Sequence, residues 1–306
     1  MSRRLRFIPE GGALVEVTCR TVHGRFLLLP RPELNEIIVG ILARAQQRYE
    51  VSVCAYIFSS NHSHLLLQVS DAQQLSSFMN YVNGNMAREA GRLAGWKEKF
   101  WSRRYEAILV SEEPGAQIGR LKYVLSHGAK ENLVARPQDW PGAHAIHALL
   151  EGTAIEGLWF SRAKEYGASR RGKEFDRLKY ATPETLILSP LPCWKHLSGN
   201  QQRERVADLV REIEAEAAAE RERTGIEPPG PAAIRAQKPH DRPNKSKKSP
   251  APFCHAASKA VRRELYDAYA WFVGCFRQAA EKWKAGDLTA CFPCGSFPPG
   301  APFVTA

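Results

Sequence analysis

The chain has 306 residues, 44% hydrophobic and 25% charged, which is the composition of a soluble globular protein with a substantial core in at least one domain. No apolar run approaches the roughly 20 residues that span a bilayer, and no long apolar stretch follows the basic start of the chain. We therefore expect no membrane segment, no secretory signal and a cytoplasmic location. The formal net charge of +11 favours a polyanionic partner, without separating DNA from RNA or an acidic membrane.

The N-terminal part predicts a strand, a helix and a β-hairpin. Residues 13–19 are rich in β-formers and indicate a first strand. Pro32 then opens a helix whose apolar positions keep helical spacing to about Tyr49. Two apolar runs, 51–58 and 62–69, flank a Ser-Ser-Asn break and predict the hairpin.

A second helix, a fourth strand and a third helix follow. Asp71 can cap a helix that runs to about Leu93, and residues 105–110 form the next strand. The third helix begins at Pro114 and runs to about His127. The order β-α-β-β-α-β-α predicts an α+β fold, a ferredoxin-like antiparallel sheet with helices on one face.

Two histidines begin the second strand of the hairpin. Side chains two apart on a strand share a face, so His62 and His64 should point the same way. Neutral imidazole is a common metal ligand, and the pair therefore suggests a metal site. The alternative is one buried and one solvated histidine without a metal.

The third helix carries a second pair of reactive side chains. Tyr123 and His127 are four residues apart, so they lie on one helical face. A tyrosine in such a position is more often part of the core than a nucleophile. Only the surrounding motifs favour a chemical role.

Three segments in order resemble the HUH single-tyrosine transposases, in particular the REP-associated tyrosine transposases and their insertion-sequence relatives. They are Asn-His-Ser-His-Leu-Leu-Leu at 61–67, the helix and its continuation at 120–134, and Asp-Trp-Pro at 139–141. The resemblance covers roughly residues 5–145. Ser63 stands where the family usually has an apolar residue, and His127-Gly128 stands where relatives commonly read Asn-Pro.

The resemblance implies a ferredoxin-like fold, Tyr123 as nucleophile, and His62 and His64 as ligands of Mg²⁺ or Mn²⁺, with His127 as a third ligand. It also implies transesterification on single-stranded or hairpin DNA. Tyr123 would take the 5′ phosphate covalently and release a 3′ hydroxyl, so no nucleotide cofactor is required. Relatives often act as homodimers or on folded hairpins.

Basic and aromatic residues next to these elements suit a nucleic-acid surface, because rings stack on bases and cations meet phosphates. The alternative is a solvated basic loop packed by its tryptophans. The predicted DNA contacts are Lys97, Lys99, Trp101, Arg103, Arg104, Arg120, Lys122 and Lys130.

The chain changes character after the expected catalytic domain at 1–150. We expect a helical extension at 151–226, a Pro-rich basic linker at 227–254, and a C-terminal helix with a Pro/Gly-rich tail at 255–306. The cations from Arg235 to Lys248 indicate a flexible segment that either follows a phosphate backbone or serves only as a linker. The seven cysteines are an odd number and mostly scattered, which favours reduced thiols, and the lone Cys-x-x-Cys at 291–294 is a weak zinc signal.

Two further classes of function stay open. A catalytically inactive, domesticated DNA- or RNA-binding protein would keep the fold and the charge. An interaction protein would act through the C-terminal helices, with the N-terminal domain as a scaffold.

Overall fold

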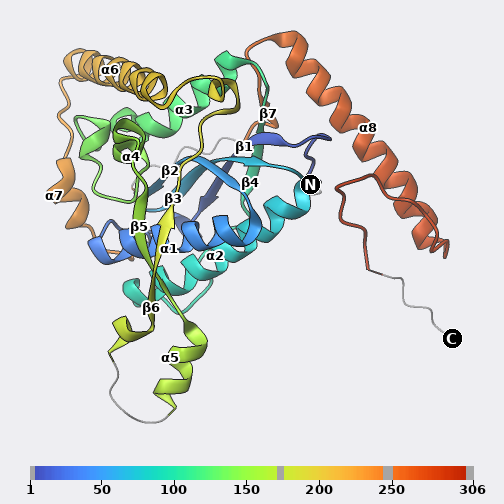
Figure 1. Cartoon of the computed structure of the whole chain (residues 1–306), viewed down its shortest axis with the longest axis horizontal. Coiled ribbons are helices and arrows are strands. Elements are labelled where there is room, and N and C mark those ends of the chain that lie inside the picture. Colours follow the sequence, from blue (N-terminus) through green and yellow to red (C-terminus); the bar gives the residue numbers. More distant parts are fainter. Residues whose placement is uncertain (1–3, 171–175, 244–250, 301–306) are drawn as a thin grey trace.

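The computed structural model describes residues 4–170, 176–243 and 251–300. A five-stranded sheet in the order β2-β3-β1-β4-β7 forms its centre (Figure 1). Neighbouring strands are antiparallel except β4 and β7, which are parallel. The strands are β1 (Ala13–Arg20), β2 (Ser52–Ser59), β3 (His62–Val69), β4 (Glu106–Val110) and β7 (Cys254–His255).

The pairing of β1 with its two neighbours decides which residues share a face. Thr18 lies opposite His64, and Glu16 lies opposite both Leu66 of β3 and Ile108 of β4. Since directly paired residues of antiparallel strands project to the same side, Glu16 and the histidines of β3 occupy one face. The other face carries apolar side chains.

Helices α1 (Pro32–Tyr49) and α2 (Ala72–Ala94) pack on each other below the sheet in Figure 1. The Asp71 side chain caps α2 as predicted, because it accepts a hydrogen bond from the Gln74 amide at 2.7 Å. Cys19 follows Thr18 on β1, so its side chain points to the opposite face, and there it contacts Asn83 of α2. These two helices therefore cover the face opposite the histidines.

Helix α3 (Pro114–Lys130) lies on the histidine face instead, next to β2 and β3. The predicted α+β fold with an antiparallel sheet is confirmed, but its helices cover both faces rather than one. The helix also continues past its expected end at His127. Gly128 lies within the helix rather than after it, and its missing side chain makes room for the Trp140 ring, which would lie 3.0 Å from an added Cβ.

The region 151–226 contains a hairpin that the sequence did not predict. Strands β5 and β6 form a separate two-stranded sheet that extends from the body of the molecule and packs on α1 (Figure 1). The sequence indicates a helix over 159–166, and the helix found here begins three residues later, at Arg162. Residues 159–160 belong to a strand instead, since a short apolar run does not distinguish a strand from a buried helix. The elements are β5 (Ile155–Phe160), α5 (Arg162–Ser169) and β6 (Ala181–Leu186).

The other elements of the C-terminal half are mainly helical, as expected. Helix α6 packs along α3 and α4. The helices are α4 (Ile146–Glu151), α6 (Gly199–Thr224), α7 (Gly230–Arg235) and α8 (Lys259–Lys284), and the 3₁₀ turns are Val22–Gly24, Pro137–Asp139, Arg177–Tyr180 and Pro192–Trp194.

The described part of the basic linker is packed rather than free. The Phe26 amide donates to the Asp241 carbonyl at 2.9 Å, and Nε2 of His240 donates to the Ala94 carbonyl at 2.9 Å. The expectation of a flexible segment is therefore wrong up to residue 243. Residues 244–248 lie outside the described residues.

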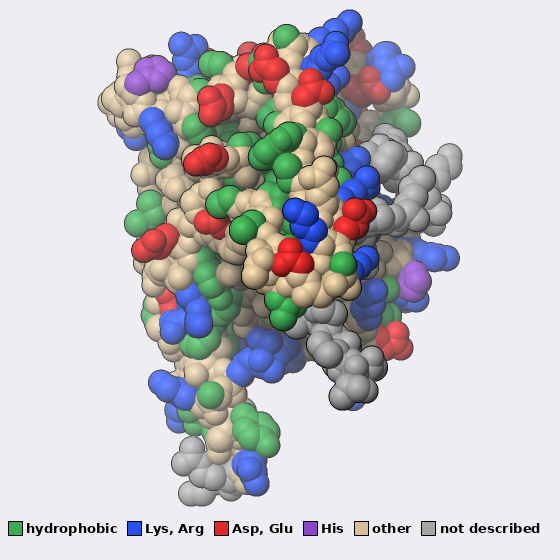
Figure 2. All heavy atoms as spheres, turned by 90° about the vertical axis from the view of Figure 1, so that its right-hand side faces the viewer, with side chains coloured by type: hydrophobic (Ala, Val, Ile, Leu, Met, Phe, Trp, Pro, Cys, Tyr) green, Lys and Arg blue, Asp and Glu red, His purple; other side chains and the backbone are tan. Residues whose placement is uncertain are grey.

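Helix α8 lies at the periphery and buries little of its surface. Only Phe272 and Ala279 of this helix are buried, whereas Trp271 is 70% exposed. The side chains that helical spacing predicts to face inward are nevertheless its less exposed side: Phe272 is buried, and the others are half-buried, namely Val261, Leu265, Tyr269, Val273 and Phe276. Figure 2 shows charged side chains of both signs and apolar side chains interspersed on this side of the molecule. Among the described residues, no helix has the length and apolar character needed to span a membrane.

The contact between α1 and β5 depends on two glycines. A Cβ on Gly40 would lie 2.3 Å from the Leu158 backbone, and one on Gly157 would lie 2.4 Å from the Gly40 nitrogen. We predict that Gly40→Ala lowers the free energy of unfolding by about 1–3 kcal/mol, as overpacking does. Urea unfolding measures this change.

Gly84, which is exposed in the middle of α2 with no atom within 4 Å of an added Cβ, provides the matched control. Gly84→Ala should raise stability by about 0.5–1 kcal/mol. Equal effects of the two substitutions would show that the α1–β5 contact is not as tight as the structure has it.

Candidate metal and nucleophile site

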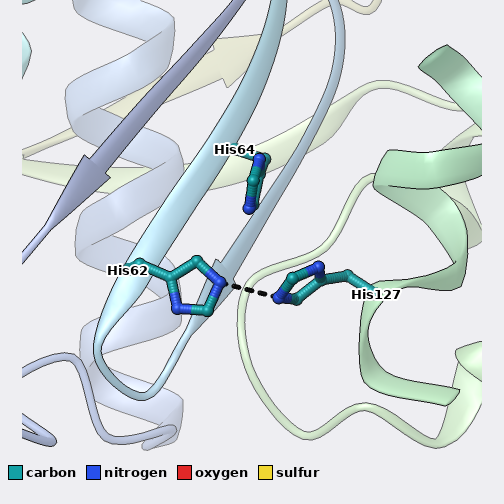
Figure 3. A group of neighbouring side chains, drawn as sticks. All are labelled: His62, His64 and His127. Carbon is teal, nitrogen blue, oxygen red and sulfur yellow. Dashed lines mark hydrogen bonds between the residues drawn. The ribbon is translucent and has the colours of Figure 1, made fainter. Parts of the chain in front are cut away.

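Three histidines from two elements converge on the α3 side of the sheet (Figure 3). His62 and His64 project from β3, and His127 projects from α3 toward them. Their ligand atoms all lie within 4.8 Å of one another, and Nε2 of His62 is 2.7 Å from Nε2 of His127. The shared face predicted for His62 and His64 is thus present, and the third histidine joins it from the helix.

Hydrogen bonds on the outer side of the β3 histidines orient their rings. Nδ1 of His62 lies 2.6 Å from Oδ1 of Asn61, and Nδ1 of His64 lies 2.8 Å from Oε1 of Glu16. Because both partners are acceptors, the neutral form of each ring carries its proton on Nδ1 and keeps a lone pair on Nε2. Metal-bound histidines are held by the same kind of outer hydrogen bond.

All three rings are largely shielded from solvent. Burial, and then the neighbouring histidines, hold the pKa of His62 well below its ordinary value. Burial and His64 likewise lower the pKa of His127 to about 3. His62 and His127 are therefore neutral at physiological pH, and neutral imidazole is the form that binds a metal.

The donor set fits a divalent transition ion. Imidazole nitrogen suits Mn²⁺ and its neighbours better than Mg²⁺, which prefers oxygen ligands and keeps several waters. Nδ1 of His127 is buried and has no hydrogen-bond partner among the described residues. Three imidazoles on one side would leave the remaining positions of a bound ion open for oxygen ligands.

Tyr123 lies next to the histidines, one turn before His127 on α3. Its ring centroid is 5.4 Å from that of His64 and 6.0 Å from that of His127. The Arg120 guanidinium lies 4.0 Å over the tyrosine ring. Burial, followed by the charge of Glu16, raises the pKa of Tyr123, so its hydroxyl is protonated at neutral pH.

Glu16 connects the metal ligands to the tyrosine, a role that the sequence analysis missed. Its carboxylate is 2% exposed and contacts His64 through Oε1 and Arg120 through Oε2, both at 2.8 Å. Burial raises its pKa, but the contacts with His255 and His64 and the charge of Arg120 outweigh burial and lower the pKa overall. The available signal was an acidic residue within an otherwise apolar strand.

Two of the predicted DNA contacts are engaged within the chain. Arg120 is only 16% exposed and is paired with Glu16. Nζ of Lys122 lies 2.8 Å from carboxylate oxygens of Glu212 and of Glu216, both on α6. The charges of Arg120 and Lys122 are thus paired with carboxylates of the same chain.

The remaining predicted contacts lie at or near the surface. Lys97, Lys99 and Arg104 are exposed, as is Arg103, which pairs with Glu106 at 3.4 Å. Two others take part in internal contacts. The Trp101 indole donates to the Asn83 carbonyl at 2.9 Å, and Nζ of Lys130 lies 4.8 Å from the centre of the Tyr123 ring.

Comparison with known proteins supports the resemblance found in the sequence. Residues 25–126 match the family model described as "Transposase IS200 like". This range includes His62, His64 and Tyr123 and ends one residue before His127. The resemblance to the single-tyrosine transposases is therefore confirmed for this part of the chain. A search of curated proteins gave no match.

Two solved structures are also similar to the chain. One is a REP-associated tyrosine transposase bound to a REP hairpin, at 16% identity and a TM-score of 0.42, covering 49% of this chain and 86% of the other. The second is a transposase candidate from Deinococcus radiodurans R1, at 18% identity and a TM-score of 0.28, covering 40% of this chain and 95% of the other.

We predict that Mn²⁺ binds at the histidines and that His62→Ala and His64→Ala each remove most of the binding, since each substitution deletes one of three nitrogen ligands. Calorimetric titration of the wild type and both variants measures the affinity. His196→Ala, at an exposed histidine, is the control and should bind as the wild type does. Unchanged affinity in both β3 variants would mean that these histidines have a structural role.

Proposed function

Starting from the IS200-like transposase signature of residues 25–126, we propose that the protein is a metal-dependent DNA strand transferase that cleaves single-stranded DNA, in particular hairpins, through Tyr123. The observation that carries the proposal is the convergence of three imidazoles and a tyrosine on one side of the sheet. A tyrosine buried for packing alone would not require a cluster of metal-ligating side chains beside it.

His62, His64 and His127 would hold the divalent ion, Mn²⁺ or Mg²⁺. When bound, such an ion supplies positive charge that polarises a non-bridging oxygen of the scissile phosphate. Because the Nε2 lone pairs of the β3 histidines already point inward, these ligands are oriented before any ion arrives.

Tyr123 would act as the nucleophile in an in-line displacement. Its hydroxyl oxygen attacks the phosphorus, the bond from phosphorus to the 3′ oxygen breaks, and the strand is left with a 5′-phosphotyrosine and a free 3′ hydroxyl. The phenol proton leaves to solvent as the bond forms, and the partial exposure of Tyr123 permits this transfer. The departing 3′ oxygen takes up a proton from solvent and becomes the hydroxyl. The phosphodiester energy is kept in the covalent link, so the 3′ hydroxyl of another strand can reverse the step.

Arg120 would fix the tyrosine for this attack. The guanidinium is held by Glu16 on one side and covers the aromatic ring on the other. The contact restricts the ring to a few orientations, which favours a productive geometry. Its positive charge also opposes the effect of Glu16 on the pKa of Tyr123.

The site is assembled from elements of one chain, since β1, β3 and α3 all belong to it. The proposed reaction therefore does not need a second subunit to complete the ligand set, and the expected homodimer would serve another purpose, such as bringing two DNA ends together. A cytoplasmic, DNA-associated location follows from the proposed substrate.

The competing candidate is a nucleic-acid-binding protein without catalytic activity on the same fold. Tyr123→Phe discriminates between the two, because it removes only the attacking oxygen. We predict that this variant binds single-stranded DNA as the wild type does but forms no covalent adduct. Incubation with labelled hairpin oligonucleotides and Mn²⁺, followed by denaturing electrophoresis, detects the adduct.

Tyr105→Phe is the matched control. Tyr105 is 7% exposed, and burial raises its pKa to about 12, so the variant should still form the adduct. An adduct that persists in Tyr123→Phe would place the nucleophile elsewhere. No adduct in the wild type, with DNA binding intact, would favour the inactive binding protein.

Replacing Lys97 and Lys99 together by alanine should weaken DNA binding and reduce its salt dependence. Each cation that meets a phosphate of a single strand contributes about 0.7 to the slope of log affinity against log salt. Lys122→Ala is the control, because its charge is already paired with Glu212 and Glu216. Fluorescence anisotropy at several salt concentrations measures both slopes, and a larger change for Lys122→Ala would reverse our assignment.

A further inference from the structure

A histidine from the far end of the chain contacts the buried carboxylate of the site. Nε2 of His255 lies 3.3 Å from Oε2 of Glu16. His255 belongs to the short strand β7, outside both the matched range 25–126 and the catalytic domain predicted from the sequence. The contact therefore joins the C-terminal segment to the ligands at the centre of the sheet.

Backbone pairing holds β7 in place beside β4. The Leu109 amide donates to the Phe253 carbonyl at 3.2 Å, and the Ser111 amide donates to the His255 carbonyl at 2.9 Å. Since backbone bonds lie on both sides of Cys254, the register of His255 is fixed. Its side chain thereby reaches Glu16 on the adjacent part of the same face.

The chain beyond β7 is anchored at the start of α3. The Glu113 carboxylate accepts hydrogen bonds from the amides of Ala257 and Ser258, at 2.8 and 3.0 Å. Burial of Phe253, which is 7% exposed, secures the segment at its other end. Residues 253–258 are thus held between the edge of the sheet and the helix that carries Tyr123.

Glu16 uses both carboxylate oxygens to orient catalytic groups. Oε1 accepts from Nδ1 of His64, and Oε2 contacts Arg120 and His255. A carboxylate that is 2% exposed cannot replace a lost partner with bulk water, so removal of one contacting side chain favours a rotation of the group. Such a rotation would misalign the ring of His64 and release Arg120 from Tyr123.

We infer that His255 is a positioning residue of the metal and nucleophile site, acting through Glu16, and that residues 253–258 belong to the catalytic unit. The inference rests on the proposed function and assigns a part in it to the C-terminal segment. His255 would not touch the substrate. It would keep the ring of His64 and the guanidinium of Arg120 in the orientations that the site needs.

The test compares His255→Ala with His255→Gln, whose amide nitrogen can take the place of Nε2. We expect His255→Ala to weaken Mn²⁺ binding about 10-fold, the lower end of what the hydrogen-bond partners of metal-bound histidines contribute. The kcat for hairpin cleavage should fall, whereas KM for DNA should stay within about twofold. His255→Gln should recover most of both losses.

A double-mutant cycle tests whether the effect passes through the carboxylate. In a Glu16→Gln background, His255→Ala should cause little further loss of Mn²⁺ affinity, because the carboxylate through which His255 acts is already absent. His196→Ala, at an exposed histidine, is the matched control and should leave Mn²⁺ affinity and kcat unchanged. Thermal unfolding by circular dichroism, monitored for each variant, identifies any that does not fold.

Each outcome decides the inference. Wild-type affinity and kcat in His255→Ala, or full additivity in the cycle, would overturn it while leaving the proposed function intact. If the wild type binds Mn²⁺ but forms no adduct, the proposed function fails, and the affinities of the variants and the cycle still decide the role of His255. A wild type that binds no Mn²⁺ overturns both.

Discussion

The ion-paired carboxylate of Glu16 is the constraint on which the rest of the site depends. A charged group at 2% exposure destabilises a fold unless it is paired and hydrogen-bonded. Here the partners are His64 of the adjacent strand, Arg120 of the covering helix and His255 of the C-terminal strand. Each comes from a different element, so satisfying one buried charge fixes the positions of three elements relative to β1.

Helix α3 packs on the histidine face, where its Arg120 pairs with Glu16 and the helix shields the histidines of β3. A sheet covered on only one face would leave the histidines of β3 in solvent, and burial would then not lower the pKa of His62. Helix α3 covers them and supplies Tyr123 and His127 at a spacing of one helical turn. Helix α6 in turn contacts α3 through the ion pairs of Lys122 with Glu212 and Glu216, which restrict the movement of the helix that carries Tyr123.

The C-terminal half is connected to the core at several places. The segment ending at residue 243 is bonded to Phe26 and Ala94, β5 packs against α1 through two glycines, and β7 extends the sheet beyond β4. Strand β7 also covers part of an edge that would otherwise expose unpaired backbone groups. These contacts pack the C-terminal half against the N-terminal sheet and its helices.

The sequence by itself determined the features that depend on local periodicity. A spacing of two on a strand put His62 and His64 on one face, and a spacing of four put Tyr123 above His127, since these repeats are set by backbone geometry. The order of strands and helices gave the antiparallel α+β fold in the same way. The sequence analysis missed the hairpin of β5 and β6, because a short apolar run is compatible with either a strand or a helix.

Only the tertiary structure decided which separate elements meet. The register between β1 and β3 brings Glu16 to His64, the side on which α3 packs turns Arg120 inward, and the parallel pairing of β7 brings His255 to the same carboxylate. None of these contacts has a local signature, because partners 48 to 239 positions apart are chosen by packing and charge compensation across the sheet. For the same reason the sequence showed that Arg120 and Lys122 are cations but not that their charges are neutralised within the chain.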